Sequence, residues 1–180
     1  MDQLVSFLLL FSLMLGQLAI YRWHRRGRRG SWSGPTYLLS FPTRLFRWVK
    51  GPLYGAIALH LVLEVLLSRS APPPRALLAA LGVGATALFL LHWSLQSLGS
   101  NFAPCDRGFL PRELVRSGPY RWLPHPIYTA NLLLVVAVAV ASFGPLVVAT
   151  GAVLALFYAF AIHDESRALR RLGAAPEGAR

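Results

Sequence analysis

The sequence predicts an all-α integral membrane protein: a bundle of about five transmembrane helices, with its N-terminus outside and its C-terminus in the cytoplasm. Of its 180 residues, 55% are hydrophobic and only 14% are charged, whereas a soluble domain of this length exposes many more charges. The apolar residues gather in runs long enough to cross a bilayer, and nearly all basic residues fall in the loops on one side. We therefore expect residues 1–180 to form a single membrane domain.

The apolar runs define the expected spans. In chain order these are about residues 4–20, 51–67, 76–93, 127–143 and 146–162. A spanning helix needs roughly 17–25 residues, so each of the first three runs crosses once, while the last run is too long for one helix. Gly144 and Pro145 interrupt that run and favour a tight turn between two antiparallel spans. Asp2 stands where a secretory signal carries positive charge, so we expect the first span to stay uncleaved.

The basic residues predict the orientation. The net charge is +11, and five alternating spans place 16 of the 18 Lys and Arg residues on one side, leaving only Arg69 and Arg75 opposite. The positive-inside rule assigns the basic side to the cytoplasm. Membrane lipids with anionic headgroups are then the expected partners, and nucleic acid is not. Cys105 is the only cysteine, so neither an intrachain disulfide nor a metal site is expected.

The segment before the second span mixes apolar and aromatic residues with Arg44, Arg47 and Lys50. Such a mixture suits a helix that lies in the headgroup region, with tryptophan at the interface and basic groups toward phosphate. Because Pro42 limits its length, we expect a short separate helix that anchors the chain to the lipid surface, rather than a substrate site.

Two ionisable residues, His60 and Glu64, lie within the second span, four residues apart and therefore on one helix face. Charge at membrane depth is costly, and such groups usually face the interior of a bundle. They are either a mutually satisfied pair that joins helices or the polar lining of a substrate or proton path.

The segment before the fourth span is polar and rich in turn formers, yet it contains aromatic residues. Ser117–Pro119 predict a turn, and prolines on both sides of His125 hold the backbone extended. Pro126 suits the first position of a new helix, on which Tyr128 and Asn131 share one face. A histidine, two tyrosines and the helix N–H groups therefore converge where the bundle meets the cytoplasm, which predicts a small-molecule pocket.

A second polar cluster, Asp164 and Glu165, lies where the last span runs into the cytoplasm. The turn between the last two spans makes them neighbours, so the start of one and the end of the other lie at the same membrane face. We therefore expect His125 and Tyr128 to approach the two carboxylates. The alternative is that the carboxylates are solvated and pair with nearby arginines, which contributes little to stability.

These clusters carry motifs of a known family. The chain reads Leu98-Gly99-x-x-Phe102, then Leu114-Val115-x-Ser117-Gly118-Pro119-Tyr120-Arg121, then His125-Pro126-x-Tyr128-Thr129, and has Asp164-Glu165 nine residues before Gly173. In this order, over roughly residues 97–173, the motifs resemble the isoprenylcysteine carboxyl methyltransferase family, to which phospholipid and bacterial thiol methyltransferases are related. The chain resembles a divergent bacterial-type member, because Pro124 stands where the family usually has Arg and Asp164 where it usually has Glu.

The resemblance implies an S-adenosylmethionine-dependent methyltransferase of the bacterial inner membrane, acting at the cytoplasmic face. Its acceptor would be a lipophilic or small thiol, carboxylate or amine that enters sideways from lipid, between helices. The cofactor-site segments would be about 97–131 and 160–173, and the residues implied to bind the cofactor are Gly118, Tyr120, His125, Tyr128, Asp164 and Glu165. Carboxylates suit its ribose hydroxyls or amino group, and tyrosine rings suit its adenine or its sulfonium. No residue is assigned to catalysis.

Two other functions remain open from the sequence. Membrane sterol reductases share a distantly similar C-terminal helical arrangement but bind NADPH, whose 2′-phosphate calls for Arg contacts. A membrane scaffold without catalytic activity is the other alternative. Binding of S-adenosylhomocysteine, of NADPH or of neither separates the three.

Overall fold

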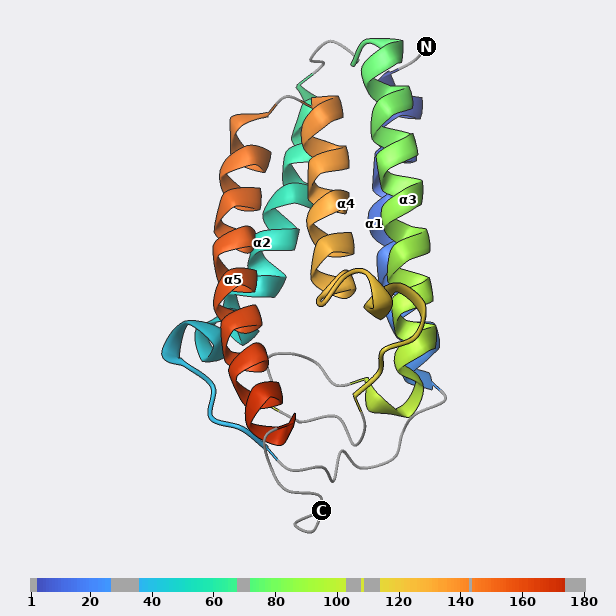
Figure 1. The fold of residues 1–180 in the computed structure, drawn as a ribbon. Helices are drawn as coiled ribbons and strands as arrows, with labels where there is room; N and C mark the ends of the chain where they lie inside the picture. Colours follow the sequence, from blue (N-terminus) through green and yellow to red (C-terminus); the bar gives the residue numbers. More distant parts are fainter. Residues whose placement is uncertain are drawn as a thin grey trace.

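The computed structural model describes residues 3–26, 36–67, 72–102, 108, 114–142 and 144–173. Within these residues the protein is all-helical and contains no β-strand. Its helices are α1 (Gln3–Arg26), α2 (Phe41–Leu66), α3 (Pro74–Leu98), α4 (Pro126–Ser142) and α5 (Pro145–Gly173), with 3-10 turns η1 (Gly99–Asn101) and η3 (Gly118–Arg121) (Figure 1). The predicted all-α class and its five helices are confirmed. Asp2, Cys105, most of the arginine-rich loop after α1 and the C-terminal tail lie outside the described residues.

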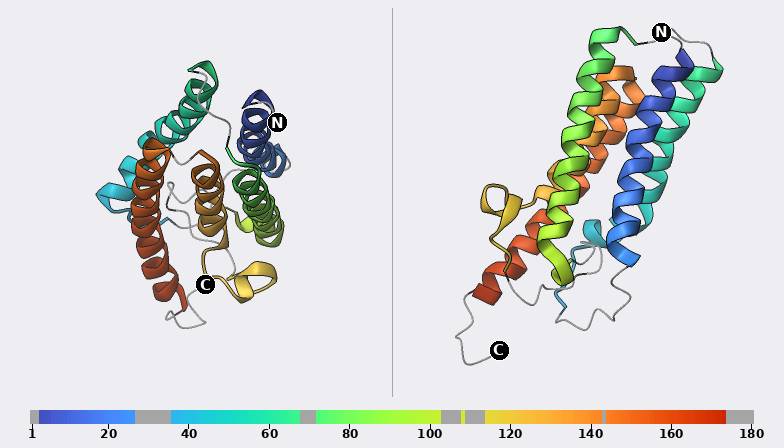
Figure 2. Two further views of the ribbon diagram at one scale, coloured as in Figure 1. Left: turned by 90° about the horizontal axis from the view of Figure 1, so that it is seen from above. Right: turned by 90° about the vertical axis from the view of Figure 1, so that its right-hand side faces the viewer.

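The five helices lie side by side and run up and down the bundle (Figure 1). Seen from above, α4 occupies the middle, with α3 and α1 on one side and α5 and α2 on the other (Figure 2). The main packed pairs are α3 with α4, α2 with α5, α1 with α3, and α4 with α5. The last of these pairs is the predicted hairpin, because α4 and α5 are joined by the turn around Gly144.

Small residues inside the bundle let the helices approach closely. Gly84 of α3 lies against Leu13 of α1, where any larger side chain would clash, and Ala80, Ala87 and Ala137 are completely buried. Large apolar side chains instead cover the outward faces, among them Leu8, Leu78, Phe89, Val148 and Leu156. An exposed apolar surface of this extent is typical of a protein that is solvated by lipid.

Three helical stretches in the described part of the chain are long and apolar enough to cross a membrane: Leu4–His24, Pro74–Asn101 and Pro145–Arg170. Helix α4 is also apolar but has 17 residues, and α2 is not among the three. The protein is therefore a membrane protein with a helical bundle. The side of the membrane on which each end lies stays a prediction.

The prediction of a short separate helix before the second span was wrong. Helix α2 begins at Phe41 and continues to Leu66 without interruption. Pro42 is its second residue, where the missing N–H has no helical partner in any case, so the proline starts the helix instead of ending it. Pro52 lies further inside, where proline bends a helix. Accordingly, the light-blue first turns of α2 lie off the line of its teal remainder (Figure 1).

His60 and Glu64, the ionisable pair within the second span, lie near the turn between α4 and α5. His60 is buried, with its Nε2 atom 3.2 Å from Oε1 of Glu64, and its ring packs on Gly144 so closely that no side chain fits there. Neither residue lines the pocket described below. These contacts favour the interpretation of a pair that joins helices over the lining of a substrate path.

Candidate functional site

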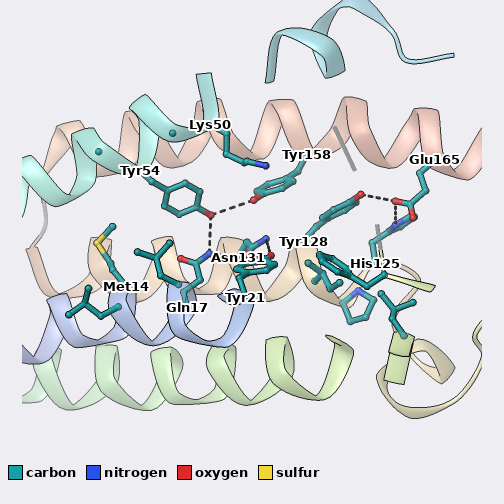
Figure 3. Close-up of a pocket in the computed structure, with 18 of the residues that line it drawn as sticks. Met14, Gln17, Tyr21, Lys50, Tyr54, His125, Tyr128, Asn131, Tyr158 and Glu165 are labelled. Carbon is teal, nitrogen blue, oxygen red and sulfur yellow. Dashed lines mark hydrogen bonds and ion pairs between the residues drawn. The ribbon is translucent and has the colours of Figure 1, made fainter. Parts of the chain in front are cut away.

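A cavity of about 600 Å³ lies among α1, α2, α4 and α5, next to the turns η1 and η3. This volume falls within the roughly 300–1,000 Å³ that is usual for small-molecule sites. The side chains follow one another along the cavity from Met14 at one end to Glu165 at the other (Figure 3). The Glu165 end is polar and the Met14 end apolar, so the cavity suits a ligand, or two ligands, of mixed character.

The polar end joins the start of α4 to the end of α5. The hydroxyl of Tyr128 donates a hydrogen bond of 2.7 Å to Oε2 of Glu165, and Nδ1 of His125 lies 3.4 Å from the same oxygen. The other ring nitrogen of His125 lies 3.1 Å from Oγ of Ser166. The predicted convergence of His125 and Tyr128 with Glu165 is therefore present. It depends on α5 continuing as a helix beyond the predicted span end at 162, to Gly173.

Stacked rings form one wall of the pocket. The rings of His125 and Tyr128 are almost parallel, with 4° between their planes and 5.5 Å between their centres. Tyr128 in turn stacks on Tyr158 of α5, with 5.2 Å between ring centres. The hydroxyl of Tyr158 lies 3.4 Å from that of Tyr54 on α2, so the row extends across to a third helix (Figure 3). Aromatic faces of this kind attract cations as well as flat rings.

The turn η3 brings Tyr120 to the pocket. Burial raises the pKa of Tyr120 above its ordinary value, and the nearby carboxylate of Glu165 raises that pKa further. The phenol therefore stays neutral and can donate a hydrogen bond. Gly118 does not line the pocket; it has a φ of +59°, and a Cβ there would clash with Ser97 of α3. Its role is to form the turn that positions Tyr120.

The two adjacent carboxylates point to different places. Asp164 does not line the pocket; its Oδ2 accepts hydrogen bonds from the Ser40 N–H (2.9 Å), the Ser40 hydroxyl (2.7 Å) and the Thr43 hydroxyl (2.7 Å). Ser40 immediately precedes α2 and Thr43 lies in its first turn, so Asp164 caps that helix and joins it to α5. Of the residues predicted to bind the cofactor, Tyr120, His125, Tyr128 and Glu165 thus lie together, whereas Asp164 and Gly118 support the surrounding structure.

A network of polar side chains lies further along the pocket. The amide of Gln17 donates to Oδ1 of Asn131 at 2.8 Å and lies 3.4 Å from the hydroxyl of Tyr54. Asn131 and Tyr21 also contact each other, because Nδ2 of Asn131 donates to the hydroxyl of Tyr21 at 3.1 Å. Asn131 was predicted to face the site, but Gln17, Tyr21 and Tyr54 were not. Gln17 carried a usable signal, because a polar amide within an apolar span usually faces the bundle interior.

The arrangement can hold a ligand that combines hydroxyl or amino groups with an aromatic ring or a positive charge. A carboxylate, a neutral phenol and stacked rings supply the matching contacts. Among the described residues, no group of three or more His, Cys, Asp and Glu is placed to hold a metal ion.

One known family matches the chain. The family model described as phospholipid methyltransferase matches residues 76–172, more than half of the chain. The match includes α4 and nearly all of α3 and α5, and with them the cluster of His125, Tyr128 and Glu165. No curated protein and no solved structure matches significantly. Helices α1 and α2, which supply the apolar end of the pocket, lie outside the matched residues.

Proposed function

The chain belongs to the phospholipid methyltransferase family, one of the isoprenylcysteine carboxyl methyltransferase-like group, and from this premise we propose that it methylates a lipophilic or small thiol, carboxylate or amine acceptor at the cytoplasmic face of the membrane. The family makes it a membrane methyltransferase. The observation that carries the proposal is the continuous pocket. It joins the polar cluster around Glu165, within the matched residues, to an apolar half between α1 and α2.

The polar end fits S-adenosylmethionine, the methyl donor that this family uses. Glu165 matches the ribose hydroxyls or the amino group, and the faces of Tyr128 and Tyr158 match the adenine ring or the sulfonium. Tyr120 adds a neutral hydroxyl donor. When bound, S-adenosylmethionine supplies a methyl group already activated on a sulfonium, which passes to a lone pair of the acceptor and leaves S-adenosylhomocysteine.

The protein's own contribution is to hold, align and shield the reactants. The hydrogen bond from Tyr128 and the contact from His125 fix the carboxylate of Glu165 in one orientation. Both ring nitrogens of His125 face groups on α5, which favours a holding role over that of a base. Most of the remaining lining is apolar or aromatic, which disfavours water in the space beside the stacked rings.

The apolar half of the pocket supports entry of the acceptor from lipid. Phe11, Met14, Leu15 and Leu18 line it from α1, at the spacing of one helix face, and small residues line it from α2. A lipophilic acceptor reaching this face has no need to leave the bilayer. The cytoplasmic location of the polar end rests on the distribution of basic residues and the positive-inside rule.

Calorimetry on the purified protein tests the proposal. We expect S-adenosylhomocysteine to bind with an affinity on the order of micromolar, and Glu165→Gln or His125→Ala to abolish the binding, because each removes part of the polar cluster. Glu64→Gln is the matched control, since it makes the same change at a carboxylate outside the pocket. Binding of NADPH in place of S-adenosylhomocysteine would support a reductase instead, and binding of neither would support a scaffold.

A further inference from the structure

Two charged residues of opposite sign mark different positions along the pocket. Among the described residues that line it, Lys50 is the only Lys or Arg and Glu165 the only Asp or Glu. Glu165 lies at the polar end beside His125, whereas Lys50 lies further along, between Tyr54 and Tyr158 (Figure 3). Lys50 belongs to α2, outside the residues that match the family. The family match therefore says nothing about its role.

The surface of α2 around Lys50 leaves room for a ligand. Gly51 and Gly55 also line the pocket, and a Cβ built on either would have no atom within 4 Å. Ala58 continues the same small-residue face one turn further on. Helix α1 supplies apolar side chains across this space, so a hydrocarbon chain fits between the two helices.

Two phenol hydroxyls lie near Lys50 in the view of the pocket (Figure 3). The hydroxyls of Tyr54 and Tyr158 lie 3.4 Å apart on facing helices, next to Lys50 along the pocket (Figure 3). The Nζ atom of Lys50 lies 5.5 Å from the centre of the Phe46 ring, which holds the side chain across the face of α2. The ammonium carries a positive charge, and because one hydroxyl of the Tyr54–Tyr158 pair donates to the other, the second keeps a proton that it can donate, so this part of the pocket suits an anion.

We propose that this part of the pocket binds the anionic head of an amphiphilic acceptor, with Lys50 as the residue that selects it. The hydroxyls of Tyr54 and Tyr158 assist Lys50, and the head's apolar chain lies between α1 and the small-residue face of α2. The anion is either the methyl-accepting group itself, a carboxylate or thiolate, or a phosphate next to an accepting amine. The inference rests on the proposed function, which assigns the methyl donor to the Glu165 end.

Binding of simple amphiphiles to the full-length protein tests this role. The probes are dodecanoate, dodecyl phosphate and dodecylamine, titrated by calorimetry in an uncharged maltoside detergent against protein-free micelles. We expect the two anions to bind more tightly than the amine, and Lys50→Met to weaken anion binding about tenfold by removing a charged donor. Lys50→Arg keeps the charge and should retain most of the binding. Arg44→Met removes a charge from an exposed position on the same helix and should leave binding unchanged.

Two results would overturn the inference: anion binding to Lys50→Met as tight as to Arg44→Met, or amine binding as tight as anion binding. Methylation of dodecanoate would identify the anion as the accepting group, whereas methylation only of an aminoethyl ester of dodecyl phosphate would make it an anchor beside the amine. Either result supports the role of Lys50. Binding of S-adenosylhomocysteine to Lys50→Met should match that to the unsubstituted protein. If neither Lys50→Met nor the unsubstituted protein bound S-adenosylhomocysteine, the proposed function would be contradicted, but the amphiphile measurement would not be affected.

Discussion

The hydroxyl of Tyr128 makes the shortest contact to the carboxylate of Glu165 at the polar end of the pocket, a hydrogen bond of 2.7 Å. Tyr128→Phe removes this hydrogen bond but keeps the ring that stacks between His125 and Tyr158. We expect affinity for S-adenosylhomocysteine to fall about tenfold, because a hydrogen bond to a charged group contributes roughly 1.5–3 kcal/mol. Tyr158→Phe, whose hydroxyl faces Tyr54 instead, should change this affinity less. Equal losses in the two variants, measured by calorimetry, would contradict the account.

Gly118 has a φ of +59°, and a Cβ there would clash with Ser97. Gly118→Ala combines backbone strain with this clash, so we expect it to lower the free energy of unfolding by about 2 kcal/mol or more. Gly99→Ala measures backbone strain alone, because Gly99 has φ +52° and ψ −129° and a Cβ there would have no atom within 4 Å. We expect it to cost about 1–3 kcal/mol. Thermal unfolding in detergent measures both, and an unchanged free energy of unfolding for Gly118→Ala would show that the packing around η3 is described wrongly.

At the scale of helices, Asp164 is a link between α5 and the first turn of α2. Asp164→Ala leaves the donors of Ser40 and Thr43 without their acceptor, so we expect a loss of about 2 kcal/mol in the free energy of unfolding. Hydrogen exchange should speed up at residues 41–44 in particular. Asp164→Asn, which retains an acceptor oxygen, should lower the free energy of unfolding by less. Unchanged exchange at this turn, with lost affinity for S-adenosylhomocysteine, would instead support the cofactor-binding role that the family resemblance implies.

The different roles of Asp164 and Glu165 show where sequence reasoning stops. Adjacent helical residues point about 100° apart, so at most one faces a given neighbour, and the position of α2 decides which. The approach of Glu165 to His125 was predictable, because a short turn makes α4 and α5 neighbours. The contact of α2 with α5 was not, since no short connection joins them. For the same reason the sequence did not predict that Lys50, Tyr54 and Tyr158 share the pocket.

For the whole molecule, the fold was predictable because each helix is encoded locally by an apolar run and its flanking prolines or loops.

The orientation in the membrane is also predicted from the sequence alone, and cysteine labelling tests it. With Cys105 replaced by Ser, an impermeant maleimide added to intact bacterial cells should label Arg75→Cys but not Arg121→Cys. Both positions are exposed, and the start of α3, which contains Arg75, lies at the opposite end of the bundle from η3, which contains Arg121 (Figure 1). The reverse pattern would place the pocket's polar end outside the cell.

The proposed function requires the methyl donor to bind at the junction between the start of α4 and the end of α5. Ultraviolet crosslinking of methyl-labelled S-adenosylmethionine, followed by peptide mapping, tests it most directly. We expect label on peptides that contain Tyr120, Tyr128 or Tyr158, and we expect it to be displaced by S-adenosylhomocysteine and to be absent from Glu165→Gln. Displaceable label confined to α1 or α2, or retained in full by Glu165→Gln, would contradict it.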